Sequence, residues 1–136
     1  MKWTSLAMKP SFYQVDSYGI VNNIYYAAWF EAGRFAVAEE ANLLSEIDSE
    51  SALSFIVCET SIRYIKPVRF RDSVLIQSTI NRVKASKISF KHRILLCSGK
   101  ILVAEGESAV VVVRNKRLLL NLPGTVSKKI MDYING

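Results

Sequence analysis

The sequence predicts an α+β domain, because one long helical segment is followed by four long segments with the pattern of β-strands. The helical period runs to about residue 42, and no repeat or low-complexity segment follows it. Strand patterns cover residues 53–64, 74–84, 87–94 and 101–114. Since 136 residues suit one hydrophobic core, we expect a single domain spanning residues 1–136.

The chain before the helix is expected to form a short apolar strand and a turn. Residues 4–13 lead into a strand that ends near Val15, and residues 16–19 have the composition of a turn. Asn22 and Asn23 come next, and asparagine caps helices because its side-chain oxygen accepts unpaired first-turn N–H groups. The helix should therefore begin just after them.

One face of the predicted helix carries Tyr26, Phe30, Gly33 and Val37 at three- and four-residue spacing. Several alanines and Gly33 keep much of the helix surface thin. A thin helix can approach a sheet closely, as a helix wrapped by a curved sheet requires. Asn42 suits the end of this helix.

The remaining chain is expected to form antiparallel strands. Residues 43–52 are polar and serine-rich, which predicts a connection with a short helical turn. Residues 87–94 alternate between a mostly apolar set and a basic set, so one face should be buried, with His92 on it, and the other should be basic. The Ser98-Gly99 pair predicts a hairpin, and residues 101–114 should form the longest and most buried strand.

The C-terminal segment is expected to add little to the sheet. Residues 118–122 suit a short extended piece, Pro123-Gly124 breaks the pattern, and residues 126–134 suit a short helix.

Composition argues against a membrane span, a metal site and a nucleic-acid partner. Half of the residues are hydrophobic, but the apolar runs fall short of the roughly 20 residues that a transmembrane helix needs. The first residues lack the apolar core of a secretory signal, so we expect a cytoplasmic protein. Cys58 and Cys97 should be reduced, and His92 has no cluster of metal ligands around it.

The net charge of +6 requires a reason, because basic proteins attract nucleic acids, anionic membranes and phosphorylated ligands. The basic residues fall at strand ends and turns, and no nucleic-acid module or pattern of interleaved aromatic and basic residues accompanies them. Most of them are expected to be solvated surface charges.

Asp16 lies just before the predicted helix, where unpaired backbone amides and the helix dipole stabilise an anion or a developing oxyanion. A carboxylate beside such amides can act as a nucleophile or as a general base. The alternative is that Asp16 only stabilises the turn, as aspartate often does in an Asp-x-x-Gly sequence.

The same stretch carries a family resemblance. It contains the pattern Asp16-x-x-Gly19-Ile20-Val21-Asn22-Asn23-x-x-Tyr26, followed by Phe30-Glu31 and Arg34. This pattern resembles the signature of the 4-hydroxybenzoyl-CoA thioesterase-like branch of the hotdog-fold acyl-CoA thioesterases, and Tyr64-x-Lys66-Pro67 with Asp72 is also similar. The resemblance covers most of the chain and implies a long central helix wrapped by a curved antiparallel β-sheet.

The resemblance also implies roles for residues of the motif. Asp16 would be the nucleophile or general base, the Asn23 backbone amide would donate to the thioester oxygen, and Gly19 would let the turn pass close to the substrate. Tyr26 would shape the acyl pocket, although an aromatic residue on this helix face also suits the core. Glu31 would face the active site of a neighbouring subunit, although a pair with Arg34 explains it equally well.

Coenzyme A would enter as part of the substrate, and no other cofactor is implied. Its phosphates would bind Arg82, Lys84 and Lys87, which are also compatible with an ordinary charged turn. Many relatives carry a histidine at the position of Ile20 or Asn23, so a histidine-assisted mechanism is not expected here.

Several alternatives stay open at this stage. The carrier could be an acyl-carrier protein, and a non-catalytic acyl-CoA-binding protein is a further alternative. The resemblance implies a homodimer or homotetramer with active sites between subunits. The sequence does not identify the acyl group.

Overall fold

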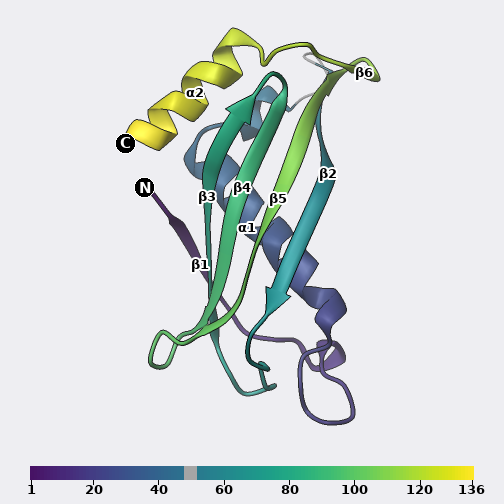
Figure 1. Cartoon of the computed structure of the whole chain (residues 1–136), viewed down its shortest axis with the longest axis vertical. Coiled ribbons are helices and arrows are strands. Elements are labelled where there is room, and N and C mark those ends of the chain that lie inside the picture. Colours follow the sequence, from purple (N-terminus) through teal and green to yellow (C-terminus); the bar gives the residue numbers. More distant parts are fainter. Residues whose placement is uncertain (48–51) are drawn as a thin grey trace.

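The computed structural model describes residues 1–47 and 52–136 and has the predicted α+β architecture. A curved antiparallel sheet packs against the helix α1, Tyr26–Glu40, which lies across one of its faces (Figure 1). The strand order is β1-β3-β4-β5-β2, and β6 pairs with β5. The strands are β1 (Thr4–Met8), β2 (Leu53–Tyr64), β3 (Val74–Lys84), β4 (Lys87–Leu96), β5 (Leu102–Arg114) and β6 (Arg117–Leu118).

β2 and β3 have the predicted boundaries, β4 continues to Leu96 and β5 begins at Leu102. β5 is the longest strand of the described chain, as expected. On β4, Ile88, Phe90, His92 and Ile94 are buried, so this strand has the predicted inward face. A short 3₁₀ turn at Leu44–Glu46 lies in the predicted connection, whose residues 48–51 fall outside the described part of the chain.

The N-terminal prediction was partly wrong, because β1 ends at Met8 instead of near Val15. Pro10 follows, and it has no N–H to pair with a neighbouring strand. A 3₁₀ turn then forms at Phe12–Gln14, and the Ser11 amide donates to the Gln14 side chain at 2.8 Å. Local capping therefore replaces strand pairing over this stretch.

The helix approaches the sheet as closely as its small residues predicted. A Cβ atom added to Gly33 would lie 2.1 Å from the Ser78 hydroxyl oxygen on β3. A Cβ atom added to Gly106 on β5 would lie 2.0 Å from the Ser61 carbonyl oxygen and 2.9 Å from the Phe30 ring. These contacts are shorter than packed atoms tolerate, so Gly33 allows α1 to pack on β3, and Gly106 allows β5 to pack against β2 and α1.

The core consists of two apolar clusters with polar side chains between them. One cluster contains Val37, Val112 and residues of the C-terminal helix α2 (Gly124–Asn135), and the other contains Trp29 and Phe30. The buried His92 ring stacks on Phe30 at 4.3 Å and lies 6.1 Å from Phe90 of the first cluster. His92 therefore marks the boundary between the two halves of the core.

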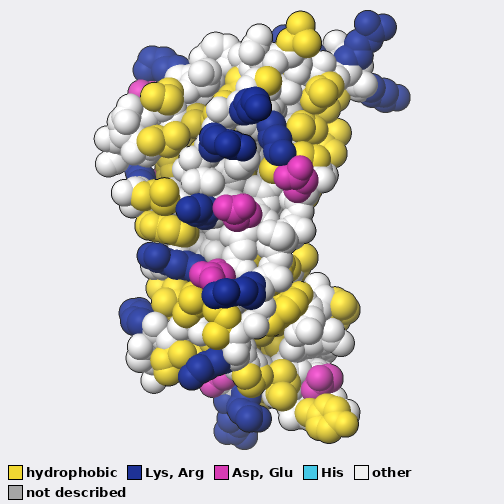
Figure 2. Space-filling view, in the orientation of Figure 1, with side chains coloured by type: hydrophobic (Ala, Val, Ile, Leu, Met, Phe, Trp, Pro, Cys, Tyr) yellow, Lys and Arg dark blue, Asp and Glu magenta, His cyan; other side chains and the backbone are white. Residues whose placement is uncertain are grey.

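Two salt bridges join charged side chains on the outer face of the sheet. Basic and acidic side chains alternate across its middle (Figure 2). Lys87 pairs with Glu59 at 3.0 Å and Arg63 pairs with Glu105 at 2.7 Å. No helix of the described chain is long and apolar enough to cross a membrane.

Candidate active site

The turn at residues 16–19 presents an exposed carboxylate. Oδ1 of Asp16 accepts hydrogen bonds from the amides of Tyr18 at 2.9 Å and Ile20 at 3.2 Å. Gly19 has φ +77°, a left-handed conformation that glycine adopts without strain, and its amide donates to the Asp16 carbonyl at 3.0 Å. Both side-chain contacts use Oδ1, so Oδ2 makes no hydrogen bond within the described residues. The turn role and a chemical role of Asp16 are therefore compatible.

The start of the helical segment offers an unpaired amide. A 3₁₀ turn at Asn23–Tyr25 precedes α1, and the Asn22 side chain caps it by accepting from the Ile24 amide at 3.2 Å. The Asn23 amide donates to no atom in the described parts of the chain, as expected for the first residue of a helical segment. The Tyr64 hydroxyl donates to the Asn23 carbonyl at 3.3 Å, which fixes this segment against the end of β2.

An open hollow of about 240 Å³ lies at this helix start. Asp16 is joined to its wall through hydrogen bonds with Ile20. The hollow is lined by Ile20, Val21, Asn23, Tyr26, Tyr64, Ile65, Lys66 and Pro67. Asn23 and Tyr26 thus line this depression, whereas Asp16 and Gly19 lie outside its lining, and Asp16 is connected to it through Ile20.

Tyr26 is buried beneath this hollow, with its ring edge-on to Tyr64 at 5.1 Å. Burial raises the pKa of the Tyr26 hydroxyl, the neighbouring Tyr64 raises it further, and a backbone hydrogen bond with Val68 opposes the shift. Tyr26 is therefore a protonated phenol at neutral pH. It suits a structural or pocket-forming role and not that of a base.

Glu31 and Arg34 line a second hollow, of about 160 Å³, between α1 and β2. No salt bridge joins Glu31 to Arg34 in the described structure, and Nη1 of Arg34 donates instead to the Ser108 hydroxyl at 2.9 Å. Burial lowers the pKa of Arg34, and the charge of Glu31 opposes that shift. Glu31 is exposed and lies about 12 Å along the helix from Asn23, at 1.5 Å per residue.

A buried chain of hydrogen bonds supports Arg34. The Ser108 hydroxyl lies 2.7 Å from Nε2 of His92, and Nδ1 of His92 lies 2.7 Å from the Ser78 hydroxyl. Burial and then the nearby Arg34 charge lower the pKa of His92 to about 3. His92 is therefore neutral at physiological pH, which suits a structural hydrogen-bond relay.

Arg82, Lys84 and Lys87 lie far from Asp16 within one chain. They flank the connection between β3 and β4, at the opposite end of the sheet from the loop that precedes α1 (Figure 1). Lys87 is paired with Glu59, whereas Arg82 and Lys84 are exposed. One chain alone therefore does not bring these cations to the Asp16 hollow.

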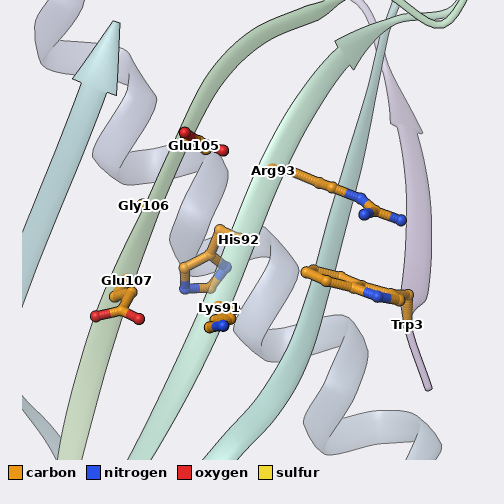
Figure 3. Close-up of a pocket in the computed structure, with 7 residues that line it drawn as sticks. All are labelled: Trp3, Lys91, His92, Arg93, Glu105, Gly106 and Glu107. Atoms are coloured by element: carbon orange, nitrogen blue, oxygen red, sulfur yellow. The ribbon is translucent and has the colours of Figure 1, made fainter. Parts of the chain in front are cut away.

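A wider hollow of about 330 Å³ lies on the outer face of the sheet (Figure 3). Arg93 reaches across it to the Trp3 ring, with its guanidinium carbon 4.0 Å from the ring centroid. Its walls are charged side chains from β4 and β5, and the buried His92 is not accessible there. Among residues 1–47 and 52–136, no cluster of three potential metal ligands occurs.

Sequence reasoning missed Arg34, Ser78 and Ser108 as parts of one network. Ser108 lies 74 residues after Arg34 in the chain, so local patterns do not join them. The signal that was present was the polar His92 on an otherwise apolar strand face, because a buried polar ring requires hydrogen-bond partners.

The family model and the curated relatives that match this chain are all described as thioesterases or thioesterase-like. Residues 10–130 match the model of the thioesterase-like superfamily. An Arabidopsis thaliana protein named acyl-acyl carrier protein thioesterase ATL3, chloroplastic, is 23% identical over 93% of this chain and 67% of its own length. A Bacillus subtilis protein named putative acyl-CoA thioesterase YneP is 25% identical over 73% of this chain and 72% of its own.

A solved structure shares the fold. Slr0204 from Synechocystis, described as a 1,4-dihydroxy-2-naphthoyl-CoA thioesterase, superposes with a TM-score of 0.84. The two are 17% identical, and the match covers 96% of this chain and 97% of that one. The long helix wrapped by a curved sheet is therefore the hotdog fold that the sequence predicted.

Proposed function

Because the chain belongs to the thioesterase-like superfamily, we propose that it hydrolyses acyl-CoA thioesters and that Asp16 is the catalytic carboxylate. The observation that carries this proposal is that Asp16 is hydrogen-bonded to Ile20, which lines the same hollow as Asn23, whose amide has no partner among the described residues. Water and the thioester are consumed, and a carboxylic acid and free coenzyme A are released.

The roles follow from the charge that develops during the reaction. As the acyl carbon becomes tetrahedral, its oxygen becomes negative, and the Asn23 amide at the positive helix end would donate to it. Asp16 would either attack the acyl carbon to give a mixed anhydride or remove a proton from the attacking water. Both routes need an ionised, accessible carboxylate, and Asp16 is exposed.

Coenzyme A phosphates would bind Arg82, Lys84 and Lys87 of a neighbouring subunit. This placement follows because these cations lie at the far end of their own sheet from Asp16. A homodimer or homotetramer is therefore part of the proposal. Acyl-carrier protein is the alternative carrier, because the Arabidopsis relative is named for it.

The β2 edge is the proposed contact between subunits. β2 lies at the end of the sheet order, and most of its 12 residues are exposed. Ile56 is 49% exposed and Val57 is 45% exposed. A long, apolar edge strand with unpaired backbone groups is a template for pairing with another strand.

Light scattering tests this contact. We expect the wild type to have at least twice the 15.3 kDa chain mass. Ile56→Lys should shift the protein toward the monomer, because a charged side chain on an edge strand opposes strand pairing. Leu118→Lys, at an exposed apolar position on β6, is the matched control and should keep the wild-type mass. A monomeric wild type would contradict the proposal.

Release of free thiol tests the reaction. We expect turnover of acyl-CoA substrates from a panel of aromatic and aliphatic acyl groups, with a lower kcat/KM for the same groups on acyl-carrier protein. A higher kcat/KM on acyl-carrier protein would reassign the carrier. Binding of acyl-CoA without turnover of any thioester would replace hydrolysis with a binding role.

A further inference from the structure

We propose that the hollow between α1 and β2 holds the acyl group of a thioester whose carbonyl lies at Asp16 and Asn23 of the neighbouring subunit, and that Arg34 donates a hydrogen bond to an uncharged oxygen atom on that acyl group. This inference rests on the thioester hydrolysis proposed above and deepens it. It assigns Arg34 as a residue that determines which acyl groups are preferred, and it makes Ser108 and His92 positioning residues.

The hollow has the size and lining for a modest acyl group. Its volume is about 160 Å³, which is less than that of the hollow at the helix start. Phe35, Ile47, Phe55 and Val57 contribute to a mainly apolar wall. We therefore choose six-carbon acyl groups to test it.

Glu31 and Arg34 are the charged residues in the described lining of this hollow. Arg34 has five N–H donors and no acceptor, and its one hydrogen bond to a described residue is the bond to Ser108. Glu31 makes no salt bridge with Arg34 in the part of the chain that the structure describes, and its charge would repel a carboxylate on the acyl group. A hydroxyl or oxo oxygen can accept from Arg34 without that repulsion.

The buried hydrogen-bond chain fixes Arg34 before a ligand arrives. Since Arg34 only donates, the Ser108 oxygen accepts from it, and the Ser108 hydroxyl proton is left for Nε2 of His92. Nδ1 is then the protonated nitrogen of the neutral His92 ring, and it donates a hydrogen bond to the Ser78 hydroxyl oxygen. Each residue of this chain donates to the next, from Arg34 to Ser108, His92 and Ser78. The guanidinium of Arg34 is therefore held in place before a ligand binds, and it loses little conformational entropy when it donates to an oxygen of the ligand.

A hydrocarbon acyl group would leave the partly buried donors of Arg34 without a partner. A site that is built to hydrogen-bond an oxygen discriminates strongly against the analogue that lacks it. Hydrogen bonds to charged groups correspond to about tenfold to hundredfold in affinity. We therefore expect the oxygen-bearing acyl group to be preferred by about tenfold or more.

The test compares hexanoyl-CoA with 3-hydroxyhexanoyl-CoA and 5-oxohexanoyl-CoA, which carry the oxygen near to and far from the thioester. Wild type should show a kcat/KM about tenfold or more higher for at least one oxygenated substrate than for hexanoyl-CoA. Arg34→Met, which keeps an unbranched side chain, should reduce this ratio to near one. Arg117→Met removes an exposed arginine on β6 and should keep the wild-type ratio.

The positioning role has its own readout. Ser108→Ala should lower the same ratio, because Arg34 then loses its anchor, and Ser108→Thr should restore it. An equal loss of kcat/KM on all three substrates in Ser108→Ala, without rescue by threonine, would contradict this role.

A binding experiment separates this inference from the proposed reaction. The thioether analogues of hexanoyl-CoA and both oxygenated CoAs cannot be hydrolysed, and calorimetry gives their Kd values with wild type and Arg34→Met. A preference for an oxygenated analogue that Arg34→Met removes supports the inference even if no thioester is turned over. Equal Kd values for all three analogues in the wild type, or a preference that Arg34→Met retains, would overturn it.

Discussion

Asp16→Asn is expected to lower kcat/KM for thioester hydrolysis by about a thousandfold, within the range of about 10² to 10⁴ that general base catalysis contributes. An amide neither attacks the acyl carbon effectively nor removes a proton from water. Oδ1 of the new side chain can still accept from the amides of Tyr18 and Ile20, so the turn should persist. Thiol release gives the activity, and thermal unfolding shows whether the fold is retained.

The matched control is Asp72→Asn in the neighbouring loop. Oδ2 of Asp72 accepts from the Arg69 amide at 2.9 Å, so this residue is also a turn carboxylate near the site. Arg69 forms a β-bridge with Ile20, which places both turns side by side. We expect Asp72→Asn to keep activity within about threefold of wild type. Wild-type turnover in Asp16→Asn would remove Asp16 from the mechanism.

Acid is expected to destabilise the fold through His92. The pKa of His92 is about 3 in the folded chain, against about 6.5 in an unfolded one, so the unfolded chain binds more protons between these values. The contribution of the neutral His92 ring to the free energy of unfolding is complete above about pH 6.5, and it is lost as the pH falls toward 3. This one residue should lower the free energy of unfolding by about 4 kcal/mol between pH 7 and pH 3.

Urea unfolding of wild type and His92→Gln at pH 7, 6, 5 and 4 measures this effect. The variant should be less stable at pH 7, because glutamine replaces the stacked ring and its two hydrogen bonds imperfectly. Its stability should also fall less steeply with acid, since it lacks the titrating group while carboxylates still titrate. Parallel pH profiles for the two proteins would show that His92 does not cause the acid sensitivity.

Features set by nearby residues were predictable from the sequence. The Asp16 turn and the Asn22 cap each involve contacts within four residues, and the alternation of β4 placed His92 inward. Reasoning from local sequence failed at the end of β1, where a capped turn forms in place of an extended strand. The Gln14 side chain accepts from the Ser11 amide in a local 3₁₀ turn, and β1 ends before this turn, earlier than the apolar composition suggested.

Contacts between distant segments were not predictable without the fold. The Tyr64 hydroxyl reaches the Asn23 carbonyl across 41 residues, and Arg34 reaches Ser108 across 74. The sequence also did not show that Arg82 and Lys84 lie at the opposite end of the sheet from Asp16, because strand direction decides that. The family resemblance supplied the fold, but the partners of Arg34 came from the structure.

The strand order has a consequence for how the chain is completed during synthesis. β1 and β2 are made early, but β1 pairs with β3 and β2 pairs with β5. The loop of Asp16 also depends on later residues, since the Val21 amide donates to the Val68 carbonyl at 2.8 Å and Ile20 bridges to Arg69. A nascent chain that ends after β2 therefore lacks every strand that pairs with its two outer strands. The segment with the motif reaches its final shape only after the ribosome has delivered the residues that enclose it.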